Sequence, residues 1–168
     1  MIDSFLKRLC SVSLDATRWV TDITTMDEHR HFMSLALEAS AKALPDCAPN
    51  PPVGCVLVKN NVVVSTGYTR QPGGLHAEVD ALSRWPDSLK GVSAYVTLEP
   101  CSFHGRTPAC AEALISRRID HVYLGMTDPD PRNNGKGIAM LREAGVDVTE
   151  GIMADAVSKF LSQYLNKS

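Results

Sequence analysis

The strongest constraint on the fold is a set of potential metal ligands in two separate segments of the chain. His76 stands in the first segment, and Cys101 and Cys110 stand in the second. One imidazole nitrogen and two thiolates suit a tetrahedral Zn²⁺ ion. Three protein ligands leave a fourth position open to water, as in a catalytic site, whereas a structural site closes with a fourth protein ligand. The fold must therefore bring these two segments together around one zinc ion per chain.

An acidic residue accompanies the ligand set. Glu78 follows His76 by two residues and is not needed as a ligand. Zinc lowers the pKa of a bound water toward neutrality, and a nearby carboxylate can move protons between that water and a leaving amine. A lone histidine or buried cysteine is more often structural, but the order His-x-Glu, Pro-Cys, Cys is that of zinc-dependent nucleobase deaminases. We therefore predict a catalytic role for Glu78 and metal ligation by His76, Cys101 and Cys110.

The length of the spacer between the two cysteines distinguishes among the families of zinc-dependent deaminases. Eight residues, 102–109, separate them, whereas nucleic-acid-editing deaminases usually have about two to four. Residues 97–110 (TLEPCSFHGRTPAC) resemble the signature of the pyrimidine deaminases of riboflavin biosynthesis. Residues 50–55, 67–68, 76–79 and 128–131 extend this resemblance from about Met26 to the C-terminus. Members of this family remove an exocyclic amine from a diaminopyrimidinone that carries a phosphorylated sugar.

The resemblance implies a fold and a set of substrate contacts. The fold would be a three-layer α/β/α cytidine-deaminase-like sandwich with a mixed sheet of about five strands. Asn50 would bind the substrate ring, because an amide both donates and accepts hydrogen bonds. Asp128 would contact the sugar, and the Arg106 guanidinium would suit the phosphate. The simpler interpretation makes Asn50 and Asp128 turn residues before proline, and Arg106 a solvated loop residue.

Three residues depart from the usual bacterial pattern of this family. Thr69 and Phe103 stand where histidines are usual, and Asp130 stands where asparagine is usual. All three fall in segments that would line the substrate side. The reaction type is thus better determined than the substrate, which could carry a ribosyl group or, as in fungal enzymes, an open-chain ribityl group.

The local patterns predict alternating helices and strands. Apolar residues at helical spacing and buried-type apolar runs mark the elements, and Asn60-Asn61 marks a hairpin turn. We expect helices at about 27–44, from near 76 to 85, around 110–116, at 137–144 and at 154–165, and strands at 53–59, from 62 onward, at 94–98, at 122–126 and at 146–149. Asp27 is a candidate N-cap and Pro45 a helix terminator.

The first 25 residues lie outside the resemblance. We therefore divide the chain into an N-terminal extension, residues 1–25, and a zinc-dependent deaminase domain, residues 26–168. The extension could be an arm that packs on a neighbouring subunit, a loosely ordered tail, or an upstream extension of the enzyme. Trp19 slightly favours docking, because burying a tryptophan removes a large apolar area from water.

Composition excludes several classes of partner. The chain has 168 residues, 17 basic and 19 acidic, so its net charge of −2 does not favour nucleic-acid binding. No run approaches the roughly 18 apolar residues of a membrane span, so we expect no membrane association. Five irregularly spaced cysteines do not suggest disulfides, which predicts a reducing compartment, the cytoplasm.

Several interpretations of function remain open at this point. The same chemistry could act on another amino-heterocycle, or the zinc site could belong to a non-catalytic module that binds a partner such as a reductase. We expect a small phosphorylated pyrimidine as substrate and a homodimer or homotetramer as the assembly. Many bacterial relatives continue into a reductase domain, so we expect a separate polypeptide to supply any reduction step.

Overall fold

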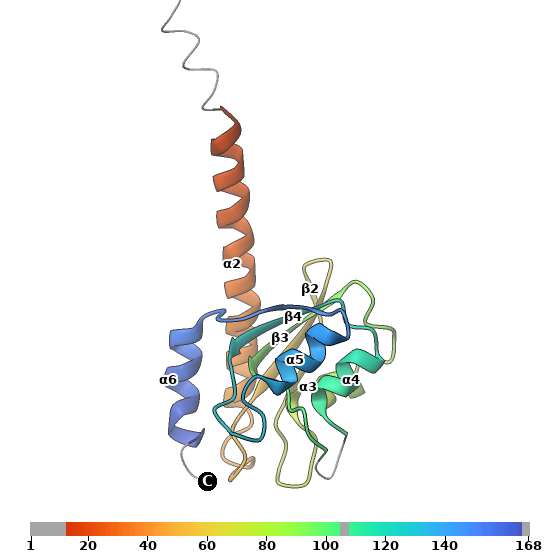
Figure 1. Ribbon diagram of the computed structural model, residues 1–168. Helices are drawn as coiled ribbons and strands as arrows, with labels where there is room; N and C mark the ends of the chain where they lie inside the picture. Colours follow the sequence, from red (N-terminus) through yellow and green to blue (C-terminus); the bar gives the residue numbers. More distant parts are fainter. Residues whose placement is uncertain (1–12, 105–107, 166–168) are drawn as a thin grey trace, which may run out of the picture.

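A mixed five-stranded sheet forms the middle layer of the molecule (Figure 1). The structure is a computed structural model that describes residues 13–104 and 108–165, with side chains from residue 25 onward. The strands are β1 (Gly54–Lys59), β2 (Val62–Tyr68), β3 (Val92–Leu98), β4 (His121–Met126) and β5 (Asp147–Thr149), in the order β2-β1-β3-β4-β5. β1 pairs antiparallel with β2 and β3, whereas β3, β4 and β5 run parallel. The predicted mixed sheet is confirmed.

Helices cover both faces of this sheet and complete the predicted α/β/α sandwich. They are α2 (Ser13–Ala41), α3 (Ala77–Ser83), α4 (Cys110–Ser116), α5 (Lys136–Glu143) and α6 (Ala154–Leu165). α2 and α6 lie on one side of the sheet, and α3, α4 and α5 lie on the other (Figure 1). Because both faces are covered, the inner strands β1 and β3 are buried along almost their whole length and are mostly apolar, rather than alternating between apolar and polar residues.

Glycine allows α2 to lie directly on β1. A Cβ atom at Gly54 would come within 1.9 Å of the Ala36 carbonyl oxygen, so no other residue fits without displacing the helix. The β1–β2 hairpin turns at Asn60 and Asn61, which both have positive φ, as the sequence predicted. The close contact at Gly54 places the start of β1, which follows the Asn50 loop, against α2.

The first helix differs from its predicted bounds. It begins at Ser13 and ends at Ala41, so Asp27 lies inside the helix and is not an N-cap. Residues 13–41 contain neither glycine nor proline, and nothing in this stretch interrupts the helical backbone. After Ala41 the amides of residues 42–44 bond to carbonyls three positions back, which tightens the chain into turns before Pro45.

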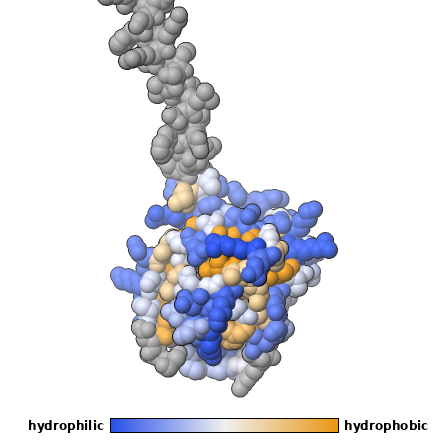
Figure 2. Space-filling view, in the orientation of Figure 1, coloured by the Kyte–Doolittle hydropathy of each residue, from blue (hydrophilic) through white to orange (hydrophobic). Residues whose placement is uncertain are grey.

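The visible surface is largely hydrophilic, with apolar residues between the polar ones (Figure 2). Among the residues with described side chains, the large exposed apolar groups are Met26, Val62 and Val63, two of them at the tip of the β1–β2 hairpin. Within the described part of the chain, no helix combines the length and the apolar character that a membrane crossing requires.

Candidate zinc centre and substrate cavity

The first metal-ligand segment is fixed at the start of α3. His76 precedes this helix with an extended backbone, and its carbonyl accepts the first helical hydrogen bond, from the Asp80 amide at 2.8 Å. Asp80 also binds the preceding loop, because its carboxylate accepts hydrogen bonds from the Tyr68 amide and the Arg70 side chain. The chain that enters the site is therefore held on both sides of His76.

The second segment joins β3 to α4. Cys101 follows the strand, and Cys110 is the first residue of the helix. The Cys110 amide donates to the Cys101 sulfur at 3.3 Å, and the Ala111 amide donates to the Cys101 carbonyl at 3.2 Å. These bonds close the long spacer and place both sulfurs beside the start of α3.

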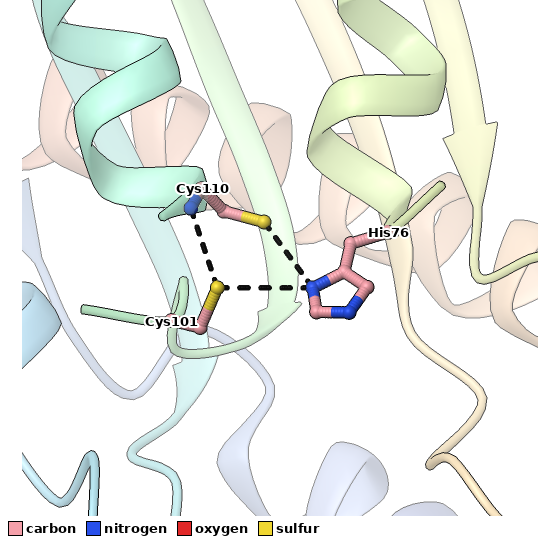
Figure 3. Close-up of side chains that lie close together, drawn as sticks. All are labelled: His76, Cys101 and Cys110. Atoms are coloured by element: carbon pink, nitrogen blue, oxygen red, sulfur yellow. Dashed lines mark hydrogen bonds between the residues drawn. The ribbon is translucent and has the colours of Figure 1, made fainter. Parts of the chain in front are cut away.

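The three predicted ligands converge. His76 Nδ1 lies 3.7 Å from the Cys101 Sγ and 3.4 Å from the Cys110 Sγ, and it points between the two sulfurs (Figure 3). All three ligand atoms lie within 4.8 Å of one another. A tetrahedral zinc with ordinary bond lengths would separate nitrogen from sulfur by about 3.6 Å. The donor set and its spacing therefore fit one zinc ion per chain.

The thiols are arranged so that one ionises easily. The pKa of Cys101 is lowered to about 4, chiefly because the Cys110 thiol hydrogen-bonds to it, with a further contribution from His76. The pKa of Cys110 is raised, because its proton is shared with Cys101 and because it is buried. Metal ligation requires both thiolates, so zinc binding must displace the remaining proton.

Glu78 lies next to the ligand set, in the first turn of α3. Its side chain is only 3% exposed. Burial is the main cause that raises the pKa of Glu78 to about 7, and the charge of Cys101 adds to it. A carboxyl group with a pKa near neutrality is suited to both accepting and donating a proton.

A cavity of about 880 Å³ opens in front of this centre. His76, Glu78 and Cys101 lie in its wall, together with Asn50 and Asp128. The structure thus brings five of the seven predicted site residues to one cavity, and the sixth, Cys110, is buried in contact with His76. Arg106, the seventh, lies outside the described residues.

The two predicted substrate-binding residues, Asn50 and Asp128, differ in how many hydrogen bonds their side chains already make within the protein. The Asn50 side chain makes no hydrogen bond with any residue that the structure describes, so both ends of its amide are available. Asp128 accepts from the Asp130 amide at 3.0 Å and from the Asn133 side chain at 3.3 Å. Asp128 therefore fills the turn role that the sequence left open, and it also faces the cavity.

Sequence reasoning missed two buried residues that hold the Asp128 loop. Glu99, 3% exposed, accepts hydrogen bonds from the amides of Asp128, Gly135 and Ile138. Asn133, fully buried, accepts from the Ser102 amide and donates to the Pro100 carbonyl. A signal for Glu99 was present, because an acidic residue that directly ends an apolar strand must find donors.

Comparison with known proteins agrees with this geometry. The family described as "Cytidine and deoxycytidylate deaminase zinc-binding region" matches residues 26–126. The chain is 44% identical over 137 residues to riboflavin biosynthesis protein RibD of Actinobacillus pleuropneumoniae, covering 80% of this chain and 36% of that protein. It is 39% identical over 131 residues to the diaminohydroxyphosphoribosylamino-pyrimidine deaminase of Buchnera aphidicola subsp. Schizaphis graminum, covering 78% of this chain and 89% of that protein.

A solved structure gives the same result in three dimensions. The diaminohydroxyphosphoribosylaminopyrimidine deaminase/5-amino-6-(5-phosphoribosylamino)uracil reductase of Thermotoga maritima superposes with a TM-score of 0.79 at 35% identity. The match covers 84% of this chain and 41% of that one, so the chain spans well under half the length of the RibD-type relatives it matches. The fold, the zinc-binding donor set and these similarities show that the chain belongs to the diaminohydroxyphosphoribosylamino-pyrimidine deaminase family, within the cytidine-deaminase-like zinc enzymes.

Proposed function

We propose that this chain hydrolytically deaminates 2,5-diamino-6-(ribosylamino)-4(3H)-pyrimidinone 5′-phosphate and releases ammonia. The observation that carries the proposal is the convergence of His76, Cys101 and Cys110 beside the buried Glu78 at the wall of a substrate-sized cavity. The name of the Buchnera relative, 89% of which is covered, supports the substrate class.

The zinc centre and Glu78 would divide the chemistry. His76, Cys101 and Cys110 would hold the zinc ion, which when bound supplies an activated water at neutral pH. Glu78 would accept a proton from that water and return it to the exocyclic nitrogen. The water oxygen would bond to the amine-bearing ring carbon, the carbon–nitrogen bond would break, and the amine would depart as ammonia. The second water proton would pass to the adjacent ring nitrogen as the ring carbonyl forms. Burial of Glu78 favours this role, because bulk water cannot compete for the proton.

The remaining predicted residues would orient the substrate. The free amide of Asn50 would pair with the donor and acceptor edge of the ring. Asp128, in the wall of the same cavity, would contact the sugar. Arg106 would bind the phosphate, an assignment that rests on the resemblance of residues 97–110 alone.

Ammonia release by the zinc-loaded protein tests the proposal, with the ribosyl and ribityl substrates measured in parallel. We expect Glu78→Gln to retain the zinc and to lose about 10²–10⁴-fold in rate, because general acid–base catalysis contributes that much. Glu143→Gln, an exposed change on α5, is the matched control. A wild-type rate in Glu78→Gln would refute the role of Glu78. No release from either substrate would refute the substrate assignment.

We propose further that residues 26–168 form the catalytic unit and act as a homodimer or homotetramer, with reduction carried out by another polypeptide. The family match from residue 26 supports the boundary. The Buchnera relative, named for deamination alone, supports the division of labour. Light scattering of the purified protein would test the assembly, and a variant starting at Met26 with lost activity would contradict the boundary.

A further inference from the structure

Phe103 and Asp130 are two of the three residues that depart from the usual family pattern, and both contact Arg132. Phe103 and Asp130 both lie in the cavity wall, and so does Arg132. The Arg132 guanidinium carbon lies 5.1 Å from the centre of the Phe103 ring, which is a cation–π distance. The Asp130 carboxylate accepts hydrogen bonds from the Arg132 Nε at 3.0 Å and from the Arg132 Nη2 at 2.5 Å. Phe103, where histidine is usual, and Asp130, where asparagine is usual, are therefore linked through their contacts with Arg132.

These contacts leave one edge of the guanidinium free. Asp130 occupies the edge formed by Nε and Nη2. Among the hydrogen bonds of the described residues, none uses Nη1, so the edge formed by Nη1 and Nη2 remains open. A guanidinium edge of this kind matches two oxygens of one phosphate group. Because the ring and the carboxylate already hold the side chain, binding an anion would cost little further conformational entropy.

The charges of the loop show what Arg132 adds. Residues 128–136 carry two acidic side chains, Asp128 and Asp130, and two basic ones, Arg132 and Lys136. The Lys136 ammonium is turned to the Pro131 and Arg132 carbonyls, at 3.4 and 3.1 Å. Of these four side chains, Asp128, Asp130 and Arg132 lie in the cavity wall. Without Arg132 the loop would present only negative charge to the cavity and would repel a phosphate. Asp130 in place of a neutral asparagine is thus tolerable because Arg132 neutralises it.

We propose that Arg132 is an anion-binding residue of the cavity, which takes the phosphate monoester of the substrate on its free edge, with Phe103 as its platform and Asp130 as its orienting partner. This inference rests on the proposed function in so far as the substrate carries a phosphate. It makes Phe103, Asp130 and Arg132 a matched set that replaces the usual imidazole and amide in recognising the sugar-phosphate end.

Binding of inorganic phosphate tests the site without any turnover. We expect calorimetry to show that phosphate binds the zinc-loaded wild type about 10-fold or more tightly than Arg132→Gln, since a hydrogen bond to a charged group contributes on that order. Arg142→Gln is the control, because Arg142 is an exposed arginine paired with Glu150 at 2.8 Å outside the cavity wall. Phosphate binding that is equal in wild type and Arg132→Gln, or absent from both, would overturn the proposal.

Turnover gives the second measurement. The measured quantity is the kcat/KM of the phosphorylated substrate divided by the kcat/KM of the same compound without its phosphate. We expect this ratio to fall about 10–100-fold in Arg132→Gln. Arg132→Lys should recover part of this ratio, because lysine keeps the charge but not the planar fork. An unchanged ratio in Arg132→Gln would overturn the proposal. A wild type that binds phosphate but deaminates neither compound would refute the proposed function and leave the anion site supported.

Discussion

Replacing Glu99 by glutamine should destabilise the loop that carries Asp128 without changing the shape of the core. In the wild type, Glu99 Oε2 accepts from the Asp128 amide at 3.1 Å and from the Gly135 amide at 2.9 Å. Oε1 accepts from the Ile138 amide at 3.2 Å. Glutamine has the same size but only one acceptor oxygen. In its more favourable orientation, the glutamine oxygen keeps the two hydrogen bonds that Glu99 Oε2 accepts. The glutamine NH2 group then faces the Ile138 N–H, which loses its acceptor.

The magnitude follows from these three bonds. One buried amide loses its acceptor, which costs about 1–3 kcal/mol. The other two bonds change from charge-assisted to neutral and lose about half their strength. Part of this loss is offset because a buried carboxylate no longer has to be desolvated. We expect a net loss of about 2–4 kcal/mol in the free energy of unfolding.

Denaturant unfolding of the zinc-loaded protein measures this loss, and Glu143→Gln on the exposed side of α5 is the control, expected within about 0.5 kcal/mol of wild type. Hydrogen exchange should also quicken at the amides of Asp128, Gly135 and Ile138 relative to the amides of β3. Unchanged stability together with unchanged exchange at these amides would show that Glu99 does not hold the loop.

Two further predictions concern the same region. Gly137→Ala should lower the free energy of unfolding by about 2 kcal/mol or more, because its Cβ would come within 2.0 Å of the Pro100 carbonyl oxygen; denaturant unfolding that matches wild type would contradict this close approach. Removing zinc with a chelator should lower the Tm and restoring zinc should raise it, since zinc at about 1,000 times its Kd stabilises by about 4 kcal/mol. The Tm shift should disappear in Cys101→Ser, and a shift that persists there would place the metal elsewhere.

Most of the elements could be predicted because their signals are local. The last helix, residues 154–165, has the predicted bounds, and the strands from 53, 94 and 122 end where the sequence placed them. Gly145, with φ of +82°, follows α5 as the left-handed residue that a helix end favours. The start of α2 was missed because a helix continues wherever nothing interrupts it, and the apolar pattern of the family domain begins only near residue 26.

The sequence by itself determined the chemistry of the centre, because zinc coordination depends on residue types in a recognisable order, and His76, Glu78, Cys101 and Cys110 carry that order locally. Only the tertiary structure decided which other side chains share the cavity. The parallel pairing of β3 with β4 sets the loop after β4 beside the loop after β3. That pairing puts Arg132 over Phe103, a contact between residues 29 positions apart in the chain that no local pattern encodes.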